Sequence, residues 1–135
     1  MYYNYHYISI DKYSRKLLAE LETVEGIAMT IKEYSLTNTS GSIIIINDTE
    51  EVYLTVQKFR IDKYVNENRY KISMEKYIVT TMGALQIING EFLEIDLNWE
   101  KYYGKLEPGK YRIVKDLKTY DNSKNYNVGV EFSIE

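Results

Sequence analysis

Alternating apolar and polar residues recur in short runs along most of the chain. In residues 27–31, Ile27, Met29 and Ile31 alternate with smaller or polar side chains, and the same period of two returns over residues 52–56. This period places apolar side chains on one face of a β-strand. Turn signals such as Asn89-Gly90 separate the runs. After residue 24 the spacing predicts seven or eight short strands, which is typical of an all-β, antiparallel sandwich.

The run 43–46 consists of four isoleucines and shows no alternation. A continuous apolar strand is expected where both faces of a sheet are covered. The predicted core draws apolar side chains from this run and from the later strands: Ile44, Ile46, Val56, Phe59, Leu97, Trp99, Leu106, Tyr111, Ile113, Phe132 and Ile134.

The first 23 residues follow a different pattern. Residues 1–10 carry tyrosines at alternating positions, which predicts a short edge strand. Residues 11–22 predict a helix that Asp11 or Ser14 can cap, with three leucines on one face. We therefore expect an N-terminal extension, residues 1–23, followed by one sandwich domain, residues 24–135.

Composition and charge exclude several kinds of function. The 135-residue chain has no cysteine and one histidine, His6, which excludes disulfides, thiol nucleophiles and thiolate or multi-histidine metal sites. Seventeen basic against twenty acidic residues give a formal charge of −3, which argues against nucleic acid as a partner. The apolar runs are far shorter than the roughly 20 residues that span a bilayer, and the N-terminus shows no signal-peptide pattern.

Leu106, Pro108, Gly109 and Tyr111 form an L-x-P-G-x-Y pattern directly before a predicted strand. In a tyrosine corner, the phenol at the start of such a strand hydrogen-bonds the backbone of the preceding connection. Leu106 would close the end of the core, and the Pro-Gly pair would make the sharp turn. The pattern therefore predicts a tyrosine corner at Tyr111 and, with it, an immunoglobulin-like sandwich.

The surrounding residues also resemble a known family. The motif W-x3-Y-G-x-L-x-P-G-x-Y-R-I-V-K, which starts at Trp99, and the closing E-F-x-I-E, which starts at Glu131, look like the bacterial immunoglobulin-like domain family of low-GC Gram-positive bacteria. The resemblance covers roughly residues 24–135. It implies a β-sandwich found in lipoproteins or as an extracytoplasmic appendage of membrane proteins, and it brings no catalytic or binding residues with it.

Three further patterns suggest chemistry only weakly. Residues 104–110 match the spacing of a phosphate-binding loop, but Tyr111 stands where Ser or Thr is needed, and the loop leads into a strand. Glu94 and Asp96 share one strand face and could act as an acid–base pair or bind Ca²⁺, but neighbours along one strand are better explained as solvated surface. His6 is better explained as a solvent-facing residue than as a general base.

Tyrosine is unusually frequent, with 15 residues. Its side chain gives rigid, amphipathic contact area and is enriched in binding surfaces. The candidate binding surface comprises Tyr2, Tyr3, Tyr5, Tyr7, Tyr102 and Tyr103. These rings could anchor a protein or stack on sugars. The alternative is that Tyr102 and Tyr103 cover the open end of the core while the N-terminal four pack on the sheet.

These observations predict a non-enzymatic binding or accessory module without a cofactor, because the sequence offers neither a nucleophile–base pair nor a metal constellation. The resemblance implies a place at the Gram-positive cell envelope, where we expect the module to act by protein–protein contact. One alternative is a glycan-binding module that uses the tyrosines. Another is a cytoplasmic or phage-encoded inhibitor on the same fold, in which the N-terminal edge strand pairs with a partner or a second copy.

Overall fold

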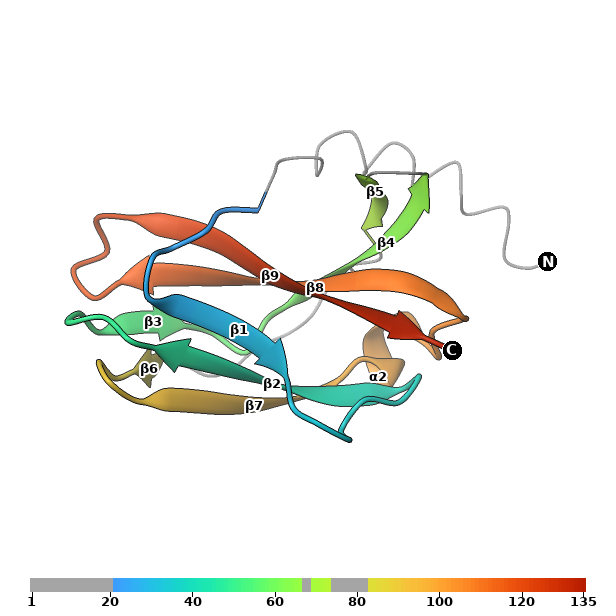
Figure 1. The fold of residues 1–135 in the computed structure, drawn as a ribbon, viewed down its shortest axis with the longest axis horizontal. Coiled ribbons are helices and arrows are strands. Elements are labelled where there is room, and N and C mark those ends of the chain that lie inside the picture. The colour runs from blue at the N-terminus through green and yellow to red at the C-terminus, as the bar shows by residue number, and fades with distance from the viewer. Residues whose placement is uncertain (1–20, 67–68, 74–82) are drawn as a thin grey trace.

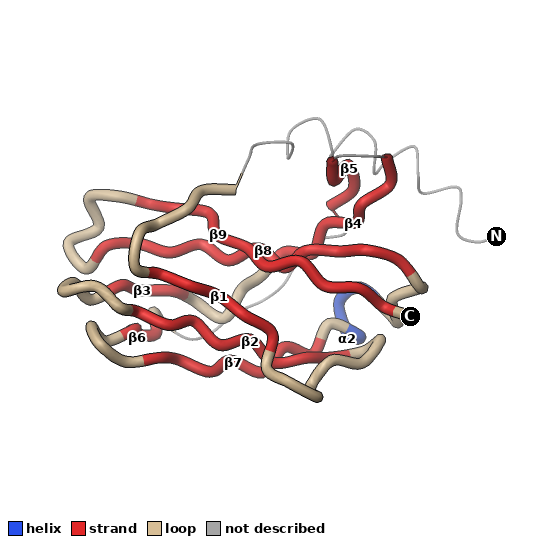
Figure 2. Tube along the Cα trace, viewed as in Figure 1, coloured by secondary structure: helices blue, strands red, loops and turns tan. Residues whose placement is uncertain are grey.

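The computed structural model describes residues 21–66, 69–73 and 83–135, in which nine strands and one short helix are found (Figures 1 and 2). The elements in chain order are β1 (Ile27–Ile31), β2 (Ser40–Asn47), β3 (Tyr53–Thr55), β4 (Arg60–Asn66), β5 (Arg69–Ser73), β6 (Leu85–Ile87), β7 (Phe92–Asn98), α2 (Glu100–Tyr103), β8 (Gly109–Thr119) and β9 (Asn125–Ile134).

The strands form two antiparallel sheets that lie face to face (Figure 1). The smaller sheet has the order β1-β2-β7. The larger has the order β5-β4-β8-β3-β6, and β9 pairs along β8 as a sixth strand. This arrangement confirms the predicted all-β, immunoglobulin-like sandwich, whose alternating inward side chains from both sheets make the core.

Strands β3 and β4 lie one after the other along β8. β4 pairs with residues 111–114 of β8, and β3 pairs with Lys118 and Thr119. In the break between them, Lys115, which is 1% exposed, donates hydrogen bonds from its Nζ to the carbonyls of Val56 and Lys58. Burial lowers the pKa of Lys115 to about 8. A core lysine thus supplies donors to backbone carbonyls that a continuous strand would have paired.

Aromatic stacking organises one half of the core. The ring of Phe132 stacks on Trp99 and on Tyr111, with both pairs of centroids 5.5 Å apart. The predicted core members that are buried are Phe59, Leu97, Trp99, Leu106, Tyr111, Ile113 and Phe132. Two others, Val56 and Ile134, are half-buried.

The expectation that Ile44 and Ile46 lie in the core is wrong. Ile43 and Ile45 are fully buried instead, and Ile46 is 41% exposed. The phase of β2 is set at its two ends. At position 41, a glycine leaves the room that the Trp99 ring occupies, since a Cβ there would lie 3.0 Å from the ring.

At the other end of β2, Asn47 also points inward. Its side chain is fully buried and donates from Nδ2 to the carbonyls of Glu51 and Ile87, each at 2.8 Å. Its Oδ1 accepts hydrogen bonds from the backbone N–H and the hydroxyl of Thr49. Because successive side chains alternate between faces, inward positions 41 and 47 require inward 43 and 45.

The tyrosine corner is confirmed. The Tyr111 hydroxyl donates a 2.6 Å hydrogen bond to the carbonyl of Glu107, four residues earlier. The short helix α2, which the sequence pattern did not indicate, precedes this corner and ends at Gly104, whose φ is +79°. The indole of Trp99 donates to the carbonyl of Asn38, so the helix start is fixed to the β1–β2 loop.

The predicted N-terminal strand and most of the predicted helix 11–22 lie outside the described residues. Of that helix, Leu21 and Glu22 are described, and they are not helical. Glu22 runs beside β9, where its N–H donates to the Asn127 carbonyl and its Oε1 accepts from the Asn127 N–H. Leu21 lies over Gly129, where an added Cβ would be only 2.4 Å from Leu21 Cδ1.

Candidate functional site

The outer face of the smaller sheet carries a row of apolar side chains. Cross-strand register places Ala28 of β1 beside Ile46 of β2, and Ile46 beside Phe92 of β7. Phe92 is 65% exposed and Ile46 41% exposed. We call Ala28, Ile46 and Phe92 the apolar row. Its large aromatic group stands in solvent on a rigid strand, next to an aliphatic side chain.

The corresponding face of the larger sheet is covered at its centre. Val114 alternates with inward Ile113 and Lys115 and so points outward, yet it is only 3% exposed. Leu21 lies over the adjacent Gly129, which pairs with Val114. The apolar row is therefore more exposed than Val114, the apolar side chain at the centre of the opposite outer face.

Charged and polar side chains continue the outer face beyond the apolar row. Lys32 Nζ lies 2.8 Å from Glu94 Oε2, and the hydroxyl of Ser42 donates to Asp96 Oδ1 at 2.6 Å. The hydrogen bond and charge of Glu94 raise the pKa of Lys32. Glu94 and Asp96 do share one face, and each is engaged by a different neighbour. Within the described residues, no group of three His, Cys, Asp or Glu side chains could hold a metal ion.

The larger sheet carries a buried ion-pair cluster on its outer face. Arg60 binds both oxygens of Asp62 through Nε and Nη2, at 2.9 and 3.1 Å. Arg112 Nε donates to Asp62 Oδ2 at 2.9 Å. Asp62 is 2% exposed, so two guanidinium groups compensate one desolvated carboxylate. This cluster links β4 to β8, and both carboxylate oxygens of Asp62 accept their hydrogen bonds from side chains of the protein.

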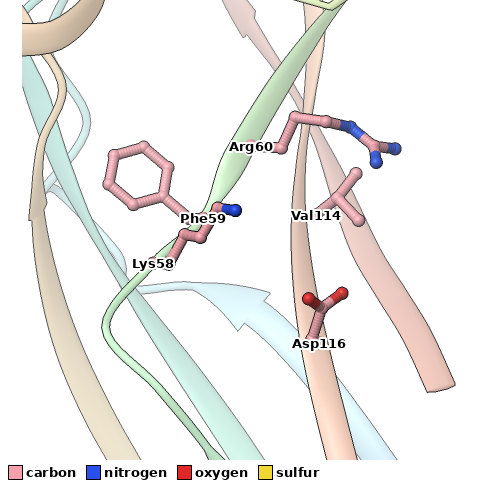
Figure 3. Close-up of a pocket in the computed structure, with 5 residues that line it drawn as sticks. All are labelled: Lys58, Phe59, Arg60, Val114 and Asp116. Carbon is pink, nitrogen blue, oxygen red and sulfur yellow. The ribbon is translucent and has the colours of Figure 1, made fainter. Parts of the chain in front are cut away.

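Beside this cluster lies a small polar hollow of about 150 Å³ (Figure 3). Its lining residues are Lys58, Phe59, Arg60, Val114 and Asp116. Figure 3 shows that the Phe59 ring points away from the Arg60 and Val114 side chains. The hollow lies at the break between β3 and β4. On the core side of the same break, Lys115 Nζ donates to the Lys58 carbonyl.

Of the predicted tyrosine surface, the structure describes Tyr102 and Tyr103. Tyr103 is buried, and its hydroxyl donates to the Phe59 carbonyl at 3.4 Å. Tyr102 is half-buried and packs edge-to-face on Phe59, with ring centroids 6.4 Å apart. These two rings cover the end of the core, as in the alternative interpretation. The other predicted tyrosines, Tyr2, Tyr3, Tyr5 and Tyr7, and also His6, lie outside the described residues.

The remaining predicted positions have structural roles. Leu106 is buried at the end of the core, and its N–H donates to the Asn38 carbonyl. Gly109 has a φ of +156° at the start of β8. The phosphate-loop pattern of residues 104–110 leads into this strand, so the helix N-terminus that the motif needs is not formed by the described residues after it.

A second hollow lies at the end of the sandwich where the β2–β3 loop meets the β8–β9 hairpin. Its volume is about 330 Å³, and its lining residues are Glu51, Val52, Tyr120 and Asp121. Tyr120 is exposed. Sequence reasoning missed this hollow and the apolar row, since both depend on which strands are neighbours. The one available signal was that Phe92 and Tyr120 each adjoin a turn.

Comparison with known proteins points to one family. A family model described as a bacterial Ig-like domain matches residues 22–133. No curated protein sequence matches the chain significantly. One solved structure with a match is a β-glucosidase from Erythrobacter marinus, with 16% identity and a TM-score of 0.38 over 80% of this chain. The match spans 15% of that enzyme's own length, and so weak a likeness carries no argument about activity.

Proposed function

The chain belongs to the bacterial Ig-like domain family, and on this premise we propose that it is a non-enzymatic module that binds another protein through the apolar row. Domains of this family are generally non-catalytic. Their sandwich scaffold holds surface groups in fixed positions, which suits recognition.

The observation that carries the proposal is the exposed pair Phe92 and Ile46. Exposed aromatic side chains that pack against an aliphatic neighbour are typical anchors of protein interfaces, where a few such residues supply most of the binding energy. Neighbouring polar side chains, the Lys32–Glu94 ion pair and Asp96, would form the rim. The rigid sheet beneath them keeps the ordering cost of binding low.

We place this function at the Gram-positive cell envelope. Two observations support the placement. The motif that starts at Trp99 resembles the envelope-associated members of such bacteria, and bacterial Ig-like domains are often extracellular. Independently of the placement, the part of the chain that the structure describes contains no helix long and apolar enough to cross a membrane. Fractionation of the native organism, with mass spectrometry of the protein in each fraction, tests the placement, since recovery in the cytosol alone would contradict it.

Site-specific crosslinking tests the binding surface. A photoreactive phenylalanine at position 92 should capture a defined protein in envelope extracts. The same group at Tyr34, which is 96% exposed in the β1–β2 loop, provides the matched control. With the captured protein purified, Phe92→Ser should weaken binding by roughly tenfold or more, and Tyr34→Ser should leave it within about twofold. Equal capture at both positions, or equal affinity of both variants, would contradict the proposal.

A further inference from the structure

The hollow at the loop end of the sandwich has the features of a site for an organic cation. We propose that it binds the side chain of a lysine or arginine in a peptide segment of a partner protein. This inference goes beyond the proposed function, because loops rather than the outer sheet face build the site, and because its ligand is charged. Its lining residues are Glu51, Val52, Tyr120 and Asp121.

Two of the lining residues, Val52 and Tyr120, suit the hydrocarbon part of such a side chain. Val52 is half-buried, and the Tyr120 ring is 61% exposed. Lysine and arginine bury their methylene stems against apolar groups while their charged heads stay at polar ones. An aromatic face also attracts an ammonium or guanidinium group that comes within about 6 Å of the ring centre. The volume of about 330 Å³ leaves room for one such side chain.

The charge of the surrounding loops complements a cation. Residues 48–51 and 120–124 together carry four carboxylates, on Asp48, Glu50, Glu51 and Asp121, against one lysine, Lys124. Asp121 accepts hydrogen bonds at Oδ1 from the Thr119 hydroxyl and the Ser123 N–H. These bonds, that from Ser123 foremost, lower the pKa of Asp121 to about 2, so it is ionised at any physiological pH.

Both loops are held in place before any ligand arrives. The buried Asn47 amide donates to the Glu51 carbonyl, and the Thr49 hydroxyl accepts a hydrogen bond from the Glu51 N–H. In the hairpin, the Thr119 hydroxyl joins Asp121 to the Lys124 N–H. A preformed site loses little conformational freedom on binding, so the interaction of one side chain can be observed by itself.

A titration of the ¹⁵N-labelled chain with blocked tripeptides, followed by amide chemical shifts, tests the proposal. The probes are acetyl-Gly-Lys-Gly-amide, its arginine counterpart and its norleucine counterpart, which is matched in shape and lacks the charge. We expect the lysine and arginine peptides to shift the amides of residues 51, 52, 120 and 121 with a dissociation constant on the order of 1–10 mM. The norleucine peptide should bind at least about fivefold more weakly.

Variants assign the effect to the hollow. Glu51→Gln removes one charge and Tyr120→Leu removes the ring, so each should weaken the lysine peptide by roughly threefold or more. Glu33→Gln, an exposed carboxylate in the β1–β2 loop, is the control and should bind like the wild type. Phe92→Ser should also bind like the wild type, which separates this site from the proposed interface. Equal binding of lysine and norleucine peptides, no saturable shift, or wild-type affinity in Glu51→Gln and Tyr120→Leu would overturn the proposal.

Discussion

Replacing Lys115 by methionine should change how the stability of the domain depends on pH. Burial lowers the pKa of Lys115 in the folded chain to about 8, against 10.5 for an exposed lysine. Between these two values the unfolded chain holds a proton that the folded chain has released. The free energy of unfolding of the wild type therefore rises with pH across this window, and the cost of the buried charge is fully present below pH 8.

The magnitude follows from the two pKa values. Their difference corresponds to roughly 3 kcal/mol, of which about 2.5 kcal/mol falls between pH 7 and pH 10. Lys115→Met also leaves the Val56 and Lys58 carbonyls without their donor, at about 1–3 kcal/mol each. That second cost does not vary with pH, so the pH dependence isolates the charge.

Urea unfolding followed by the fluorescence of Trp99, the one tryptophan of the chain, supplies the measurement. The compared quantity is the wild-type free energy of unfolding minus that of the variant, so that titrating groups common to both proteins contribute equally to the two values and cancel. We expect this difference to grow by roughly 2 kcal/mol from pH 7 to pH 10. A difference constant within about 0.5 kcal/mol would refute the reasoning, because Lys115 would then hold its proton equally in both states. Lys115→Gln, which keeps one donor, serves if the methionine variant does not fold.

Two further predictions concern buried hydrogen bonds. Tyr111→Phe removes the 2.6 Å bond to the Glu107 carbonyl and should lower the free energy of unfolding by about 0.5–1.5 kcal/mol. Tyr103→Phe is the comparison: it removes a longer bond of 3.4 Å and should lower the free energy of unfolding by less. An unchanged urea midpoint for Tyr111→Phe would count against the corner as a stabilising contact. Asn47→Ala leaves the Ile87 carbonyl without its buried side-chain donor and also removes the part-buried bond to the Glu51 carbonyl, so it should cost about 2–4 kcal/mol in a thermal or urea melt. A loss below about 0.5 kcal/mol would show that water replaces the amide.

Features that depend on neighbours in sequence could be predicted. The tyrosine corner is one, since Leu106, Pro108, Gly109 and Tyr111 lie within six positions and each has a local geometric role. The inward position of Lys115 could also have been read from its sequence. Lys115 continues the period of two that runs from Tyr111 through Ile113. The pattern is easy to overlook because a lysine is not expected at an inward position.

Features that depend on distant segments could not be predicted. The four isoleucines of residues 43–46 fit either phase equally well. The phase is decided by Gly41, which packs against Trp99, and by Asn47, whose side chain donates to the carbonyls of Glu51 and Ile87. The apolar row likewise exists because β7 pairs with β2 in one register, which places Phe92 beside Ile46. Strand neighbours of this kind are set by the packing of the whole sandwich rather than by any local pattern.

The burial of Asn47 has a consequence for the chain when it is made in a host that glycosylates secreted proteins. Asn38-Thr39-Ser40 and Asn47-Asp48-Thr49 both match the acceptor pattern for N-linked glycans. In the folded domain the Asn47 amide nitrogen is committed to two carbonyls, whereas the Asn38 side chain is exposed. A sugar at Asn47 could therefore be attached only before β2 and β6 come together. The glycan occupancy of Asn47 relative to that of Asn38 would therefore report how fast the domain folds compared with how fast it is glycosylated.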